Sequence, residues 1–128
     1  MSDYMTKIGE LRTYSRRVNL MAKVLEVGEP REVSSSSDGR LHHVAEALIG
    51  DPTGTVLLTL WDEYVDKFSE GDVIKVENGY AGTFRGKLRL NIGKYGNAEN
   101  VDEKIEGIET ENNMSERDFG INYRRRGR

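Results

Sequence analysis

The stretch of the chain best suited to chemistry is residues 80–96, YAGTFRGKLRLNIGKYG, which combines three aromatic with four basic side chains. No acidic residue occurs between Asn78 and Ala98, although the whole chain has a formal net charge of -3. Flat rings can stack on nucleobases without demanding a sequence, and neighbouring cations can neutralise phosphates. The composition therefore indicates a surface for single-stranded nucleic acid.

Alternation along the chain indicates which side chains point outward, because a strand sends alternate side chains to opposite faces. In the segment 55–61, TVLLTLW, the purely aliphatic parity should face the core, which leaves Trp61 on the outer face with two threonines. In the segment 87–92, KLRLNI, aliphatic and polar residues alternate in the same way. The resulting candidates for the binding surface are Trp61, Tyr80, Phe84, Arg85, Lys87, Arg89, Asn91, Lys94 and Tyr95.

The elements that must position these residues follow from hydrophobic alternation and turn signals. Strands are predicted over residues 17–27, 41–50, 55–61, 72–79 and 87–92. A short helix, DEYVDKFS, capped by Asp62, follows the third strand. Gly79 is interpreted as a bulge and Arg85 with Gly86 as a hairpin turn, and a loop over residues 30–40 should flank the binding face. This order predicts an all-β OB-fold, a five-stranded, partly open Greek-key barrel with a short helix between strands three and four.

Length and composition fit one domain with an extension at each end. Residues 17–100 are the predicted OB-fold domain. Residues 1–16 should form a lead-in that lies against the barrel, with Ile8 and Leu11 as anchors. Residues 101–128 contain scattered apolar residues without a sustained period, so we expect a flexible, charged tail that does not pack.

Each candidate also has an ordinary structural interpretation. Trp61 could plug one end of the barrel, since tryptophan is well buried on average. Tyr80 and Phe84 could be ordinary strand aromatics, and for Tyr95 both interpretations stand. The alternating cations of the last strand are what any solvated strand face shows. None of these interpretations explains why acids are absent from residues 79–97.

Several classes of function are not expected. The chain has no cysteine, which excludes disulfides, thiolate metal sites and cysteine nucleophiles. His42 and His43 are adjacent on a predicted strand, so they face opposite sides and cannot chelate one ion together. The carboxylates are dispersed, so we expect no catalytic site, metal or cofactor. No apolar run approaches the roughly 18 residues of a membrane span and no secretory signal is evident, which favours the cytoplasm, or the nucleus in a eukaryote.

A family resemblance is carried by the series GDPTG, LTLWD and EGDVIKVENGYAGTFRGKLRLNIG. This series closely resembles the simple single-OB-fold single-stranded DNA-binding proteins of archaea, the related small eukaryotic proteins of DNA repair complexes, and the OB domains of replication protein A. The likeness begins near KIGELR and fades near residue 100. By this resemblance Trp61, Tyr80 and Phe84 match the base-stacking aromatics, while Arg85 and Lys94 match basic positions near the backbone path.

The resemblance and the candidate surface together predict a non-enzymatic protein that coats and protects single-stranded DNA in replication, recombination or repair. Some relatives have an aromatic residue where this chain has Asn91, so a polar contact is expected there. Two alternatives stay open: an OB-fold scaffold that binds proteins of a repair complex, and a binder of single-stranded RNA. We expect a monomer. The tail ends in RRRGR at 124–128 and is interpreted as solubilising, with recruitment of repair or replication proteins, or a weak nucleic-acid contact, as alternatives.

Overall fold

One seven-stranded sheet dominates the computed structural model, which describes residues 5–34 and 39–116. The strands are β1 (Val18–Val27), β2 (Arg31–Ser34), β3 (Leu41–Asp51), β4 (Gly54–Trp61), β5 (Val73–Phe84), β6 (Lys87–Asn91) and β7 (Asn97–Asn100). Short 3-10 helices are η1 (Ile8–Glu10), η2 (Asp62–Tyr64) and η3 (Met114–Glu116). No helix in these two ranges is long and apolar enough to cross a membrane.

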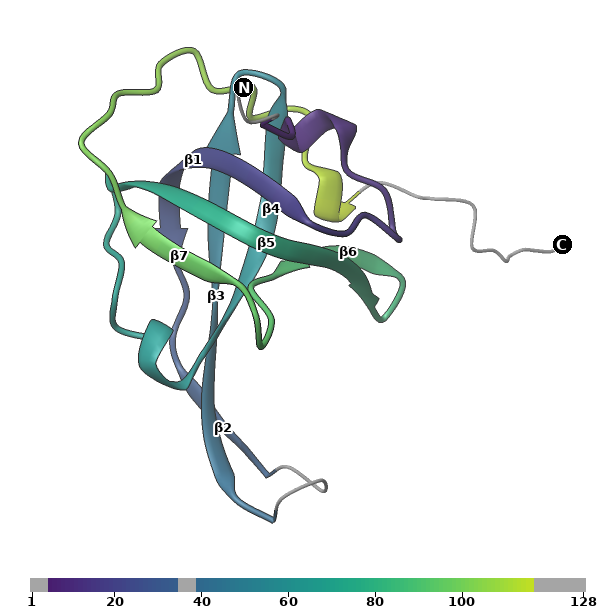
Figure 1. The fold of residues 1–128 in the computed structure, drawn as a ribbon, viewed down its shortest axis with the longest axis vertical. Coiled ribbons are helices and arrows are strands. Elements are labelled where there is room, and N and C mark those ends of the chain that lie inside the picture. The colour runs from purple at the N-terminus through teal and green to yellow at the C-terminus, as the bar shows by residue number, and fades with distance from the viewer. Residues whose placement is uncertain (1–4, 35–38, 117–128) are drawn as a thin grey trace, which may run out of the picture.

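Five of the strands close into a barrel (Figure 1). β1 pairs antiparallel with β3 and with β5, β3 pairs with β4, and β5 pairs with β6. The parallel pairing of β4 with β6 completes the ring. This is the Greek-key arrangement of an OB-fold, so the predicted fold class is confirmed.

The core follows the predicted alternation. Val56, Leu58 and Leu60 of β4 are fully buried, as are Leu88 and Leu90 of β6. Because side chains alternate along a strand, this burial fixes the opposite parity of both strands on the outer face. The outer face of β4 and β6 is therefore the one on which the candidate residues lie.

The structure extends the predicted strands and adds two short ones. β5 runs through to Phe84, and the turn at Arg85 and Gly86 is confirmed by their positive φ of 55° and 80°. The bulge in β5 is also present, since the register with β1 shifts between Val18 and Leu20, but Asn78 rather than Gly79 takes the left-handed conformation, with φ 56°.

β2 lies inside the segment predicted as a loop. It pairs with the first part of β3, and the two form an arm that extends from the barrel (Figure 1). Three of its four residues are exposed, so no hydrophobic alternation marks it in the sequence. β7 is not predicted from the sequence for a similar reason. Ala98 is its one buried residue, so it too has no hydrophobic alternation.

Asp62 does not cap a helix through its side chain, which corrects the prediction made from the sequence. It is instead the first residue of η2, with a positive φ of 50°, and η2 has no side-chain cap. Its carboxylate accepts hydrogen bonds from β3 instead, from the backbone N–H of His43 and the ring of His42. The contact with a neighbouring strand replaces the local cap.

Both ends of the described chain pack on the barrel. Ile8 and Leu11 are fully buried in the core, as expected. The expectation that nothing beyond residue 100 packs is wrong for the segment that ends at residue 116, because Met114 is also fully buried in the core. The hydroxyl of Ser115 donates to the Leu88 carbonyl (2.5 Å) and accepts from the Leu57 N–H (2.9 Å).

This packing rests on single residues, so no pattern in the sequence predicts it. One methionine and one serine, with a backbone hydrogen bond from Thr55 to Asn112, create no hydrophobic period. The remaining tail, residues 117–128 with the terminal RRRGR, lies outside the described residues. The division of the chain at residues 16 and 100 stays a prediction.

Candidate nucleic-acid interface

Candidate residues from different strands lie next to one another on the outer face of β3, β4, β6 and β5. Across the sheet, Glu46 of β3 lies opposite Thr59 of β4, Thr59 opposite Asn91 of β6, and Asn91 opposite Tyr80 of β5. Trp61 lies two residues beyond Thr59 on the same face of β4, since successive side chains alternate. Thr59 and Asn91, which are 32 positions apart in sequence, are thus cross-strand neighbours.

Three aromatic side chains stand exposed on this face. The exposed fraction is 45% for Trp61, 41% for Tyr80 and 48% for Phe84. Trp61 is the only tryptophan of the chain. Such exposure is large for aromatic side chains, which bury much of their area when they serve a core. The interpretation of Trp61 as a barrel plug is therefore wrong.

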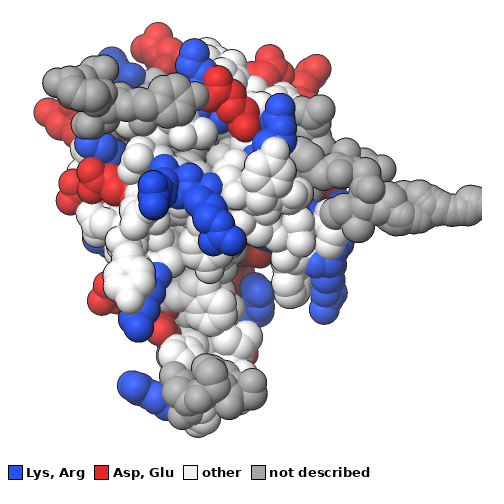
Figure 2. Space-filling view, turned by 45° about the vertical axis from the view of Figure 1, so that its right-hand side comes forward, with Lys and Arg blue, Asp and Glu red and all other residues white. Residues whose placement is uncertain are grey.

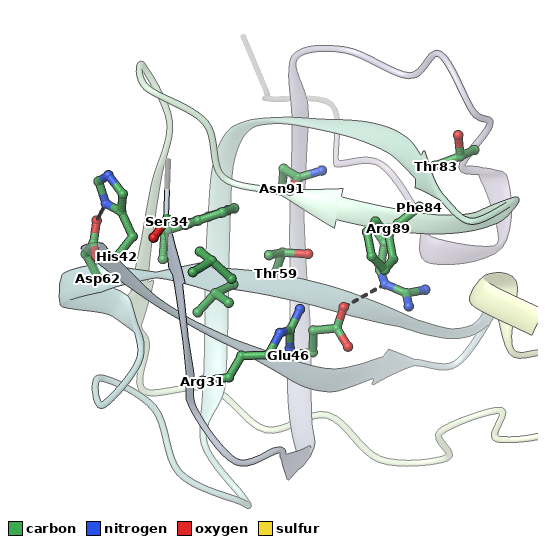
Figure 3. Close-up of a pocket in the computed structure, with 13 residues that line it drawn as sticks. Arg31, Ser34, His42, Glu46, Thr59, Asp62, Thr83, Phe84, Arg89 and Asn91 are labelled. Atoms are coloured by element: carbon green, nitrogen blue, oxygen red, sulfur yellow. Dashed lines mark hydrogen bonds and ion pairs between the residues drawn. The ribbon is translucent and has the colours of Figure 1, made fainter. Parts of the chain in front are cut away.

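A large hollow begins at Phe84 and reaches Trp61. Its volume is about 880 Å³, and β2 contributes to its wall through Arg31 and Ser34 (Figure 3). A second hollow, of about 450 Å³, continues from Trp61 to Tyr80. The two hollows share part of their lining, including Trp61 and Asn91.

We call these two joined hollows the aromatic groove. The groove residues used below are Glu46, Thr59, Trp61, Asp62, Tyr80, Phe84, Arg89, Asn91 and Lys94. The groove extends across four strands and contains exposed rings, so several unpaired bases could stack along it in succession. On the side of the molecule seen in the space-filling view, blue side chains lie among white ones near the middle, and most red side chains lie toward the upper and left-hand margins (Figure 2).

The cations of β6 are not equally available. Arg89 Nε lies 2.8 Å from Glu46 Oε2, and the Arg89 side chain is 12% exposed (Figure 3). Lys87 Nζ lies 3.1 Å from Glu116 Oε1, and Lys87 lines neither hollow of the groove. Two of the four predicted phosphate contacts therefore already have a carboxylate partner.

Arg85 and Lys94 have no carboxylate partner within residues 5–34 and 39–116. The guanidinium carbon of Arg85 lies 5.1 Å from the centroid of the Phe84 ring, and that of Arg89 lies 5.8 Å from it. A cation at this distance is attracted to the negative face of an aromatic ring. Two guanidinium groups thus contact the Phe84 ring, which favours one orientation of the ring before any ligand binds.

Tyr80 is positioned by a glycine. Gly93 has φ 81°, a conformation that other residues rarely adopt. A Cβ atom placed on Gly93 would lie 2.9 Å from Cε1 of Tyr80, so the ring rests directly against the backbone there. Gly82 separates Tyr80 from Phe84 on the same face of β5 and leaves the space between the two rings without a side chain.

The groove also contains acidic and histidine side chains that the candidate set does not include. Asp62 Oδ2 lies 2.7 Å from His42 Nδ1, and the His42 ring meets Trp61 edge to face with centroids 6.2 Å apart. The hydrogen bond from His42, followed by that from the His43 N–H, holds the pKa of the Asp62 carboxyl below its ordinary value. Trp61 is therefore flanked by a hydrogen-bonded histidine and carboxylate.

Glu46 was detectable in part from the sequence. It shares the outer parity of residues 41–50 with His42 and Val44, so its outward direction follows from alternation. Its pairing with Arg89 depends on the barrel closure between β4 and β6, which no local pattern encodes. The described ranges contain no group of three or more histidine, aspartate or glutamate side chains that could hold a metal ion.

Comparison with known proteins gives a match to one family. The family model described as single-stranded DNA binding protein Ssb-like, OB fold, matches residues 11–100. The chain is 38% identical over 87 residues to a protein named single-stranded DNA binding protein Ssb from Saccharolobus solfataricus, covering 68% of this chain and 57% of that protein. It is 34% identical over 121 residues to a protein named replication factor A from Methanothermobacter thermautotrophicus, covering 88% of this chain.

The chain spans only part of these two relatives, since the second match covers 15% of replication factor A. Among solved structures, a hypothetical protein from Arabidopsis thaliana superposes with a TM-score of 0.75 at 24% identity. The superposition covers 98% of this chain and 92% of the other. At this identity the likeness supports the fold alone.

Proposed function

Because this chain belongs to the Ssb-like family of OB-fold single-stranded DNA-binding proteins, we propose that it binds single-stranded DNA along the aromatic groove. The observation that carries the proposal is the exposure of Trp61, Tyr80 and Phe84 on one hollowed face. A protein that only folds as a barrel gains nothing from leaving three rings in water. A protein that binds unpaired bases needs them there.

The three rings act as stacking platforms. Each base stacked on an aromatic side chain contributes about 1 to 3 kcal/mol, and every base offers a flat face. Binding should therefore be largely independent of sequence. Asn91 lies between the rings of Trp61 and Tyr80 in the groove and offers a hydrogen bond to a base edge or sugar.

Duplex DNA should bind poorly. Its bases are paired and stacked on one another, so they offer no free face to the three rings. Coating of unpaired strands during replication, recombination or repair is the role that this selectivity supports. We propose that the protein performs it as a monomer, without catalysis, in the cytoplasm or, in a eukaryote, the nucleus.

Competition binding with a labelled DNA oligomer tests the proposal. Unlabelled single-stranded DNA should displace the label, and duplex DNA of the same sequence should not. RNA of that sequence decides between DNA and RNA, because only a contact to the 2′-hydroxyl would favour RNA. Displacement by duplex as efficient as by single strands would contradict the proposal.

A scaffold for repair proteins is the second candidate function, supported by the acidic remainder of the surface. Replacing Trp61 and Phe84 by alanine separates the two functions. If the protein is primarily a scaffold, partner pulldown persists in that variant while DNA binding is lost. If DNA binding is primary, the cellular role is lost with DNA binding. Replacing Tyr14, an aromatic residue that is 74% exposed and lines none of the hollows described above, by alanine is the matched control.

A further inference from the structure

We propose that the bound strand continues past Tyr80 into a second site, a basic hollow formed by Arg16, Arg17, Lys94 and Tyr95, which binds the phosphates of the next nucleotides. This inference rests on the proposed function, because it extends the path of the same ligand. It assigns a binding role to the lead-in before β1, where the sequence pointed only to packing anchors. The ligand class is the sugar-phosphate backbone of a single-stranded nucleic acid.

The basic hollow adjoins the aromatic groove directly. It has a volume of about 250 Å³ and shares Tyr80, Gly93 and Lys94 with the hollow that connects Tyr80 to Trp61. A strand whose base stacks on Tyr80 therefore finds a continuous depression in front of it. The path runs from β5 across Gly93 toward the residues that precede β1.

Charge distinguishes this hollow from the groove. Among the residues that the structure describes, its lining contains three cations and no acidic side chain. In contrast, Glu46 and Asp62 line the hollow at Phe84, and Asp62 and Glu63 line the hollow at Tyr80. Phosphate neutralisation releases counterions and favours binding wherever the cations are not already compensated. The basic hollow is therefore the best phosphate site on this path.

The two arginines are available for a ligand. Both are exposed, and neither guanidinium has a hydrogen-bond or carboxylate partner within the ranges that the structure describes. Arg89, by comparison, is committed to Glu46. A planar guanidinium suits bidentate contact with phosphate, which an ammonium group does not offer.

The rim of the hollow is held in place by side-chain hydrogen bonds. The amide nitrogen of Asn19 donates to the Arg17 carbonyl (3.3 Å), and its amide oxygen accepts from the Asn78 N–H (2.9 Å). Asn78 in turn donates to the carbonyl of Tyr95 (3.3 Å). Three separate segments of the chain are thus tied together around one depression, so the cations are presented from a fixed frame.

Tyr95 supplies a further ring at this site. It is 82% exposed, and Lys94 Nζ lies 5.6 Å from the centroid of its ring. An exposed ring beside cations is the combination that stacks a base while the cations hold its phosphate. This gives Tyr95 a binding role that its sequence position alone left open.

Binding to short and long oligomers tests the inference. We would compare wild type with the double variant Arg16→Gln/Arg17→Asn, since asparagine tolerates the positive φ of 51° at position 17. The probes are oligo(dT) strands of about 4 and about 16 nucleotides, the limits of OB-fold footprints. The long strand reaches the basic hollow and the short one is accommodated by the aromatic groove.

The double variant should bind the short strand as wild type does and the long strand more weakly, by roughly tenfold at about 50 mM salt. The slope of log K against log salt for the long strand should fall in magnitude by about 1.4, for two lost phosphate contacts. Lys23→Gln/Lys104→Gln removes the same charge outside these hollows and should leave the slope unchanged. Arg16→Lys/Arg17→Lys should retain the slope.

Two outcomes overturn the inference in distinguishable ways. In the first, wild type binds both strands, and Arg16→Gln/Arg17→Asn matches Lys23→Gln/Lys104→Gln at every strand length and salt concentration. The basic hollow then has no role in binding, while binding by the aromatic groove is unaffected. If wild type binds neither strand, the proposed function is overturned and this inference with it.

Discussion

The two ends of the proposed binding path hold their positive charge in different ways. At the Phe84 end, Arg89 is almost buried and paired with Glu46. At the Tyr80 end, Lys94, Arg16 and Arg17 surround a hollow that no acidic side chain from residues 5–34 or 39–116 lines. The contrast suggests that the first end binds mainly by stacking and the second mainly by electrostatics. Variants at each end should therefore differ in affinity and in salt dependence.

The largest effect is expected when stacking is removed. Replacing Trp61 and Phe84 together by alanine should cost about 2 to 6 kcal/mol of binding free energy, since each stacked base contributes about 1 to 3 kcal/mol. The salt slope should change little, because neither residue neutralises a phosphate. Fluorescence anisotropy of a labelled oligomer measures both quantities. If the magnitude of the salt slope also fell by the amount expected for a lost phosphate contact, about 0.7, the assignment of stacking to this end would be contradicted.

The ion pair at the groove floor should affect stability more than its exposed counterpart. Arg89→Ala leaves the partly buried Glu46 without its partner, which we expect to cost about 1 to 3 kcal/mol of unfolding free energy. Lys87 lies on the same strand as Arg89, and Lys87→Ala breaks its exposed pair with Glu116 of η3, which should cost about 0 to 1 kcal/mol. Denaturant titration of both variants compares them. Equal losses would show that the difference in burial between the two pairs does not determine their contribution to stability.

Gly93 tests whether the orientation of Tyr80 matters for binding. Gly93→Ala should lose about 1 to 2 kcal/mol of stability from its positive φ, and the new Cβ should push the Tyr80 ring away. Gly71→Ala is the matched control, because Gly71 has φ 93° and open space around the position of a Cβ. Both variants should be destabilised, but only Gly93→Ala should bind DNA more weakly. If both variants bound DNA equally well, the orientation of the Tyr80 ring would not matter for binding.

A smaller effect, of opposite sign, is expected from Glu46. Glu46→Gln removes a negative charge from the groove and releases the cation of Arg89 toward a phosphate. Affinity for single strands should rise by a few fold, and the magnitude of the salt slope should rise by up to about 0.7. Glu99→Gln, an exposed change on β7, is the control for net charge. An unchanged slope would mean that Arg89 never reaches the DNA.

The smallest effect concerns pH. The pKa of Asp62 is lowered by the His42 hydrogen bond, so its contribution to stability is present above its unfolded pKa and is lost as pH falls through the folded value. Asp62→Asn should therefore differ from wild type above about pH 4 and approach it as the pH falls further. Thermal unfolding from pH 3 to 7 measures the difference. A stability difference that stays constant over that range would show that it does not arise from the protonation of Asp62.

The fold and the outward rings could be predicted because both depend on local alternation. Val56, Leu58 and Leu60 occupy one parity of β4, and that pattern alone placed Trp61 outside. The turn at Arg85 and Gly86 followed equally from local chemistry. Periodicity of two and turn preferences act within a few residues, so they can be read from one sequence.

The charge arrangement of the site could not be predicted, because it depends on contacts between distant strands. Glu46 meets Arg89 only once β4 pairs with β6, and Arg16 reaches Lys94 only once the barrel closes. Met114 was missed because one buried side chain leaves no pattern. Composition shows where cations gather along the chain but not which of them already have partners.

Quenching of Trp61 fluorescence by oligo(dT) is the sharpest test of binding along the aromatic groove, because the only tryptophan of the chain lies in the middle of the proposed path. We expect saturable quenching by single strands at low salt and no comparable change with duplex DNA of equal length. Emission that stays constant while the protein shifts labelled single strands in a gel would place binding elsewhere. Constant emission with no shift would contradict binding itself.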